Sequence, residues 1–132
     1  MPRVLWPLHQ RRPSVEIILI RAADGQPQVR RLLADTGAGT AQSGFELLLS
    51  PADCRMAGGT ASRPVSLRGA FAGHFPVFLI RVQIPALQFD NGVPAVAAAK
   101  VPTGFDGIAC FRFLNRFTYG NFGDPTAFGL EL

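Results

Sequence analysis

Short apolar segments separated by glycine and proline run along the whole chain and predict an all-β protein. Residues 14–21 form a strongly apolar strand, Asp24-Gly25 is a hairpin signal, and residues 28–34 return as a second strand. Fourteen glycines and eleven prolines divide the rest into short segments rich in valine, isoleucine, leucine and phenylalanine. No internal repeat is visible, so we expect one structural unit rather than two fused halves.

Further strands and turns follow from the same pattern. We expect strands over residues 45–49, 64–71, 75–84, 87–90, 93–99, 117–122 and 126–132. Turns are predicted around residues 72–74, between two of the longest of these strands, and at Asn91-Gly92.

Two segments have helical features. Ser50 precedes Pro51 and predicts a helical turn over residues 51–54, because serine caps helices and proline suits their first position. Residues 55–63 form a connector of small residues. Residues 108–117 have the clearest helical spacing, with three large apolar side chains on one side, and predict a short helix near the carboxyl terminus.

Composition sets the number of domains and the compartment. We expect an amino-terminal extension over residues 1–13 and one domain over residues 14–132 of the 132-residue chain. The amino terminus lacks the features of a signal peptide, and no apolar run approaches the roughly 18 residues of a membrane span, so we expect a cytoplasmic protein. Cys54 and Cys110 fit free thiols better than a disulfide framework. Hydrophobic residues make up 48% of the chain, which suggests extra apolar surface buried between subunits.

Charge allows a nucleic-acid partner but does not favour one. The formal net charge is +4, yet the arginines are scattered, and the densest spots are the pairs Arg11-Arg12 and Arg30-Arg31. We therefore prefer the interpretation of a solvated basic surface. His9 and His74 stand alone, so no metal site is expected.

The residues with the clearest chemical potential are Asp35-Thr36-Gly37. Asp35 lies where a buried strand runs out into a glycine-bearing loop, which would hold its carboxylate rigidly. Gly37 tolerates unusual dihedral angles and close approach of a neighbour, and the Thr36 hydroxyl can donate and accept a hydrogen bond. The alternative is an ordinary turn, because aspartate, threonine and glycine all favour turns.

Amide hydrolysis by carboxylates needs two of them close together and sharing one proton, so that one acts as base and the other as acid. Repulsion between the two charges separates the pKa values of such a pair. No other aspartate in this sequence is followed by Thr-Gly. If the chain is catalytic, the second carboxylate must therefore come from another copy related by a twofold axis.

The segment 32–38, Leu-Leu-Ala-Asp-Thr-Gly-Ala, resembles the active-site loop of retropepsin-like aspartic peptidases, especially microbial members. Other parts of that family's pattern follow in order, over roughly residues 14–132: a hairpin before the loop, a glycine-containing flap at residues 67–74, and an apolar segment entering a short helix at residues 104–117. The resemblance implies a closed or partly open β-barrel with a flap hairpin and one short carboxyl-terminal helix. It also implies a homodimeric endopeptidase that acts on peptides or proteins without a cofactor.

The resemblance also assigns roles to residues. Asp35 would be the catalytic carboxylate, Thr36 would bond across the dimer axis, and Gly37 and Ala38 would support the loop and place the substrate main chain. The flap that closes over the substrate would contain Gly69, Ala70, Phe71, Ala72, Gly73 and His74. The end strands, including residues 127–132, would join the two subunits in a shared sheet.

One departure from the family pattern leaves a rival open. Two apolar residues and a glycine are usual where this chain has Ile108-Ala109-Cys110, so the glycine either sits earlier, at Gly107, or is replaced by Cys110. A side chain at position 110 must fit beneath the active-site loop. The alternative function is therefore a catalytically weak or inactive dimeric domain that binds peptides or acts as a scaffold.

Overall fold

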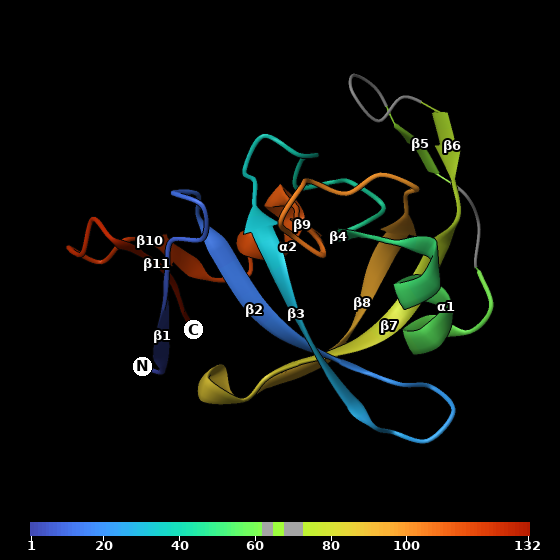
Figure 1. The fold of residues 1–132 in the computed structure, drawn as a ribbon, viewed down its shortest axis with the longest axis horizontal. Coiled ribbons are helices and arrows are strands. Elements are labelled where there is room, and N and C mark those ends of the chain that lie inside the picture. Colours follow the sequence, from blue (N-terminus) through green and yellow to red (C-terminus); the bar gives the residue numbers. More distant parts are fainter. Residues whose placement is uncertain (62–64, 68–72) are drawn as a thin grey trace.

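The chain folds mainly into β-strands around a closed six-stranded barrel (Figure 1). A computed structural model describes residues 1–61, 65–67 and 73–132. The barrel order is β2-β3-β9-β4-β8-β7. Its strands are β2 (Ser14–Ile20), β3 (Pro27–Ala34), β4 (Leu47–Leu49), β7 (Val77–Ile84), β8 (Phe89–Ala97) and β9 (Gly107–Ala109). The all-β prediction is confirmed at the level of a mostly β protein with a barrel.

Alternation of side chains explains the first hairpin of the barrel. In β2, Val15, Ile17 and Leu19 are fully buried, whereas the residues between them are half-buried. The predicted turn after β2 is confirmed, with Gly25 at a φ of 76° and the Asp24 carboxylate accepting a hydrogen bond from the Gln26 amide. This hairpin leads β3 toward the active-site loop predicted at its carboxyl end.

A three-stranded sheet lies beside the barrel, on the opposite side from the hairpin of β5 (Val65–Leu67) and β6 (Gly73–Phe75) (Figure 1). Its order is β1 (Arg3–Pro7), β11 (Ala127–Glu131) and β10 (Thr118–Gly120), all antiparallel. The sheet includes residues 3–7 of the segment predicted as an extension, because β1 pairs with β11 along its whole length. Both edges of β11 are therefore occupied by strands of its own chain.

Two α-helices accompany the strands in the described part of the chain. In α1 (Pro51–Gly58), Ser50 caps the amino terminus by accepting a hydrogen bond from the Asp53 amide, as predicted. This helix extends beyond the predicted turn, so the expectation of a connector over residues 55–63 is wrong for its first four residues. The second helix, α2 (Phe111–Leu114), is much shorter than the predicted 108–117. Residues 107–109 form β9 instead, because they pair with β3 on one side and β4 on the other.

The turn expected at Asn91-Gly92 is also absent, since β8 continues through both residues and pairs with β7 there. The chain reverses earlier, through the 3₁₀ helix η2 (Pro85–Leu87) and Gln88, which has a φ of 55°. Proline favours the first turn of a helix, and the long ladder between β7 and β8 outweighs the local turn preference of Asn-Gly.

The hairpin predicted as a flap has a different register from the expected one. It pairs β5 (Val65–Leu67) with β6 (Gly73–Phe75), so Gly73 and His74 lie in a strand rather than in the predicted turn. The other predicted flap residues, Gly69, Ala70, Phe71 and Ala72, lie outside the described residues.

Candidate active site

Asp35 lies at the carboxyl end of β3, immediately after Ala34. The Asp35 amide donates a 3.0 Å hydrogen bond to the carbonyl of Ala109, which continues the parallel pairing of β3 with β9. The Ala34 amide donates to the carbonyl of Pro13 at 2.9 Å. The backbone that presents Asp35 is thus held from both sides by the barrel.

The residues after Asp35 form a tight turn around its carboxylate. The Gly37 amide donates a 2.9 Å hydrogen bond to Asp35 Oδ1, and the Ala38 amide donates to the Asp35 carbonyl at 3.2 Å. A Cβ at position 37 would lie only 3.2 Å from Oδ1, so glycine leaves space beside the carboxylate. Thr36 is exposed, and its hydroxyl has no hydrogen-bond partner within the described residues.

Asp35 differs from most carboxylates of the chain in having no basic partner among the residues that the structure describes. All nine acidic residues lie in the described segments, and six of them form ion pairs with arginine. These six are Glu16, Asp24, Glu46, Asp53, Asp90 and Glu131. Asp106 and Asp124 are exposed; Asp106 accepts a hydrogen bond from the Arg31 amide in β3, and Asp124 accepts from the amide and hydroxyl of Thr126. The other eight carboxylates thus have partners of their own, so a carboxylate pair at Asp35 would need another copy.

Consecutive residues after β9 hold the loop that follows Asp35. Cys110 donates its amide to the Glu46 carbonyl at 3.0 Å, and Phe111 donates its amide to the Ala38 carbonyl at 2.9 Å. Arg112 Nη1 reaches the Ser43 carbonyl at 2.7 Å. The loop over residues 36–45 is therefore fixed at its two ends and at two points between them.

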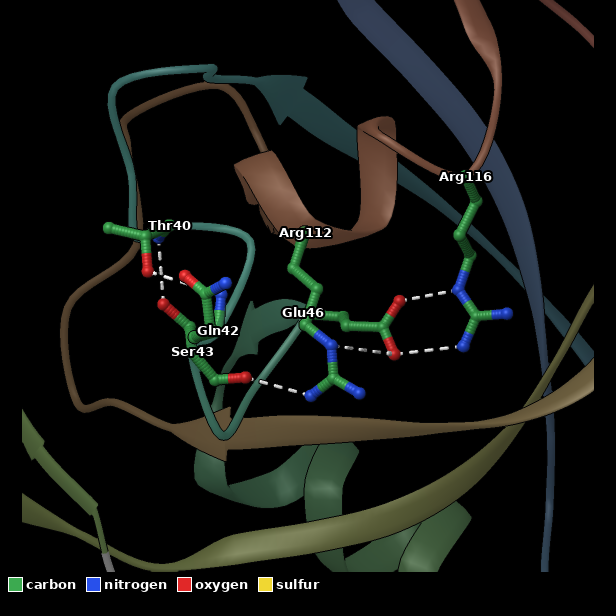
Figure 2. Close-up of polar contacts among 6 residues, drawn as sticks. All are labelled: Thr40, Gln42, Ser43, Glu46, Arg112 and Arg116. Carbon is green, nitrogen blue, oxygen red and sulfur yellow. Dashed lines mark hydrogen bonds and ion pairs between the residues drawn. The ribbon is translucent and has the colours of Figure 1, made fainter.

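Sequence reasoning missed Glu46, whose side chain is only 1% exposed. Figure 2 shows its carboxylate facing two arginines: Arg116 donates to both oxygens, at 2.5 and 2.9 Å, and Arg112 Nε lies 4.0 Å away. The hydrogen bond to Glu46 raises the pKa of the Arg116 guanidinium. The available signal was a charged residue within an apolar run, but its partner follows 70 positions later.

Cys110 fits beneath the loop without backbone strain. It is 1% exposed, has ordinary extended dihedral angles, and packs in a small cluster that includes Phe45, Leu48 and Ile108. Burial, followed by the charges of Asp35 and Glu46, raises the pKa of its thiol to about 12. Phe75, at the end of β6, packs against the same cluster, so the base of the β5–β6 hairpin adjoins the floor of the site.

Gly107 lies where two barrel strands approach each other closely. An added Cβ there would lie 2.2 Å from the Leu48 carbonyl oxygen, so this glycine permits close contact between β9 and β4. Its role is therefore in the packing of the barrel strands.

The described part of the chain contains no helix long and apolar enough to cross a membrane, and no cluster of three or more residues suited to hold a metal ion. The sequence matches no protein-family model, and no curated protein is similar enough to it to count as a relative.

Proposed function

We propose that two copies of this chain form an aspartic endopeptidase of the retropepsin type, with Asp35 from each copy as the catalytic pair. The observation that carries the proposal is the environment of Asp35: a half-buried carboxylate on a rigid loop, hydrogen-bonded to backbone and paired with no arginine of the described segments. A carboxylate without a basic partner can take up and release a proton, as acid–base chemistry requires. The barrel and its adjoining β5–β6 hairpin support the same assignment.

In the proposed reaction, one Asp35 carboxylate removes a proton from a water molecule while the protonated partner donates to the carbonyl oxygen of the peptide bond. The water oxygen bonds to the carbonyl carbon, and the tetrahedral intermediate collapses when the amide nitrogen receives a proton and leaves as an amine. Thr36, whose hydroxyl bonds to none of the described residues, would bond to the loop of the partner copy. Because such a pair works with one shared proton, we expect the fastest hydrolysis on the acidic side of neutrality.

Mixed dimers provide the test. Asp35→Asn should abolish hydrolysis while leaving the thermal midpoint nearly unchanged, because asparagine can still accept the hydrogen bond from the Gly37 amide. If subunits mix at random, equal amounts of this variant and the wild type should have about one quarter of the activity of the same total amount of wild type, since only dimers with two intact copies work. Asp24→Asn, in the hairpin turn after β2, is the matched control and should keep full activity. An activity of one half after the two chains have been unfolded and refolded together, so that their subunits have mixed, would mean that each chain works alone.

A dimeric peptide-binding domain without catalysis remains the second candidate. The observation that motivates this candidate is Cys110, which stands where the family pattern can have a glycine. The binding function would be favoured if the wild type binds extended peptides but cleaves none. The nucleic-acid alternative is weaker, because seven arginines of the described residues are already paired with carboxylates: Arg3, Arg21, Arg30, Arg31, Arg81, Arg112 and Arg116.

A further inference from the structure

Glu46 is a buried carboxylate that the proposed reaction does not use. It stands just before β4, at the far end of the loop that begins with Asp35, and its side chain is 1% exposed. Burying a charge is costly, and a well-packed apolar side chain at such a position is often at least as favourable for stability. The residue therefore needs a reason other than the stability of the fold.

The partners of Glu46 come from one short segment. Arg116 forms a bidentate pair with the carboxylate, and Arg112, within α2, lies against one of the same oxygens (Figure 2). Bidentate guanidinium–carboxylate pairs fix orientation as well as distance, which a packed apolar pair does not. The angle between α2 and the start of β4 is thereby set by polar geometry.

The residues just before these arginines hold the loop that contains Asp35. Along residues 109–112, successive groups contact the Asp35 amide, the Glu46 carbonyl, the Ala38 carbonyl and the Ser43 carbonyl. A rotation of this segment relative to β4 would move all four anchors together. The position of the Asp35 carboxylate is thus coupled to the geometry of the Glu46 pair.

A second polar feature stiffens the loop between these anchors. The Ser43 hydroxyl accepts a 2.8 Å hydrogen bond from the Thr40 amide, and the Thr40 hydroxyl accepts from the Gln42 amide (Figure 2). Arg112 binds the carbonyl of Ser43, so a movement of this arginine is passed to a locally rigid turn. In a loop without these two hydrogen bonds, a movement of Arg112 would be lost before it reached Asp35.

We infer that Glu46 is a positioning residue, which acts through Arg116 and Arg112 to hold the Asp35 loop in the shape that pairing of two carboxylates requires. The inference rests on the proposed peptidase function for its catalytic consequence, but not for the coupling within the loop. Displacements of about 1 Å at a catalytic group can lower turnover by up to about a hundredfold, so a positioning residue should affect kcat more than KM.

The test replaces the polar pair by an apolar one. In Glu46→Met with Arg116→Leu, we expect the thermal midpoint to stay near that of the wild type, because apolar replacements of buried ion pairs are well tolerated. We expect amide hydrogen exchange at Gly37 and Phe111 to speed up about tenfold, and kcat to fall at least about tenfold with KM little changed. Asp53→Asn, which breaks the part-buried bidentate pair of Asp53 with Arg30, is the control and should change neither the exchange rates nor kcat.

Two readouts separate the two proposals. Unchanged exchange at Gly37 and Phe111 in the folded variant would overturn the positioning role, whatever the activity. Faster exchange in a chain whose wild type shows no hydrolysis dependent on Asp35 would support the coupling and reject the peptidase. If the double variant fails to fold, Arg112→Gln replaces it, because this side chain is 41% exposed. In that variant, amide hydrogen exchange in the loop around Ser43 should speed up and kcat should fall. Unchanged exchange together with an unchanged kcat would overturn the inference.

Discussion

The close contact of β9 with β4 makes Gly107→Ala a direct test of how the barrel is packed. A Cβ at this position would lie 2.2 Å from the Leu48 carbonyl oxygen and 2.9 Å from Leu49 Cδ2. Strand β4 cannot move away freely, because it pairs with β8 on its other edge and its three leucines are all buried. Overpacking of this kind costs about 1–3 kcal/mol, and a contact with backbone belongs at the upper end of that range.

Part of this cost is offset in the unfolded chain, where alanine has less conformational freedom than glycine by about 0.4–1 kcal/mol. We therefore expect Gly107→Ala to reduce the free energy of unfolding by about 2 kcal/mol, which corresponds to a drop of about 8 °C in Tm for a chain of this size. The assay is reversible thermal unfolding followed by far-UV circular dichroism.

Gly92→Ala is the matched control, since Gly92 also lies in a strand, without a positive φ. An added Cβ there would meet Leu79 Cδ1 at an ordinary 3.4 Å, so the offset in the unfolded chain should dominate. We expect this variant to be as stable as the wild type or slightly more so. If Gly107→Ala unfolds within about 1 °C of Gly92→Ala, the contact between β9 and β4 is not as close as described and the reasoning fails.

Four further predictions concern the two cysteines and strand β1. Cys110→Gly should lower the free energy of unfolding by about 2 kcal/mol, through lost burial and a more flexible backbone, and should not raise kcat; a faster enzyme would instead mean that the thiol impairs the site. Burial raises the pKa of Cys110 and of Cys54 to about 12, so both should resist a thiol reagent at pH 8 until urea unfolds the chain. Because the unfolded thiols lose their protons near pH 9 and the folded ones near pH 12, stability to urea should fall as the pH rises through that window, and a rise would contradict the assignment. Deleting residues 1–7 should destabilise the protein rather than activate it, because β1 and the partly buried Trp6 are lost; the measurement is Tm together with activity, and a more active, equally stable product would refute this.

The parts of the fold that local sequence determines were predictable. The hairpin over β2 and β3 follows from apolar alternation and Asp24-Gly25, and the start of α1 follows from the serine cap before Pro51. The position of Asp35 at the end of a buried strand was predictable for the same reason. Each of these features depends on residues only a few positions apart.

The errors concern elements whose conformation is decided by distant partners. Residues 107–109 have helix-like spacing with the segment that follows, yet they become a strand because β3 and β4 flank them. Asn91-Gly92 has a turn signature, yet β7 pairs with it. Likewise, nothing near Glu46 in the sequence indicates its arginine partner, which is 70 residues away. Local propensity is a weak guide wherever a long ladder or a buried ion pair is available.

The three-stranded sheet limits how the proposed dimer can form. Because β1 and β10 occupy both edges of β11, two copies cannot join by pairing one β11 with the other unless a strand is displaced. One solution exchanges β1 between copies, so that each β11 keeps a full ladder; another adds the partner along the outer edge of β10. Deletion of residues 1–7 distinguishes the two arrangements of the dimer. In the first arrangement the truncated chain loses its dimer and its hydrolysis together, whereas in the second it becomes less stable but still dimerises and cleaves with Asp35.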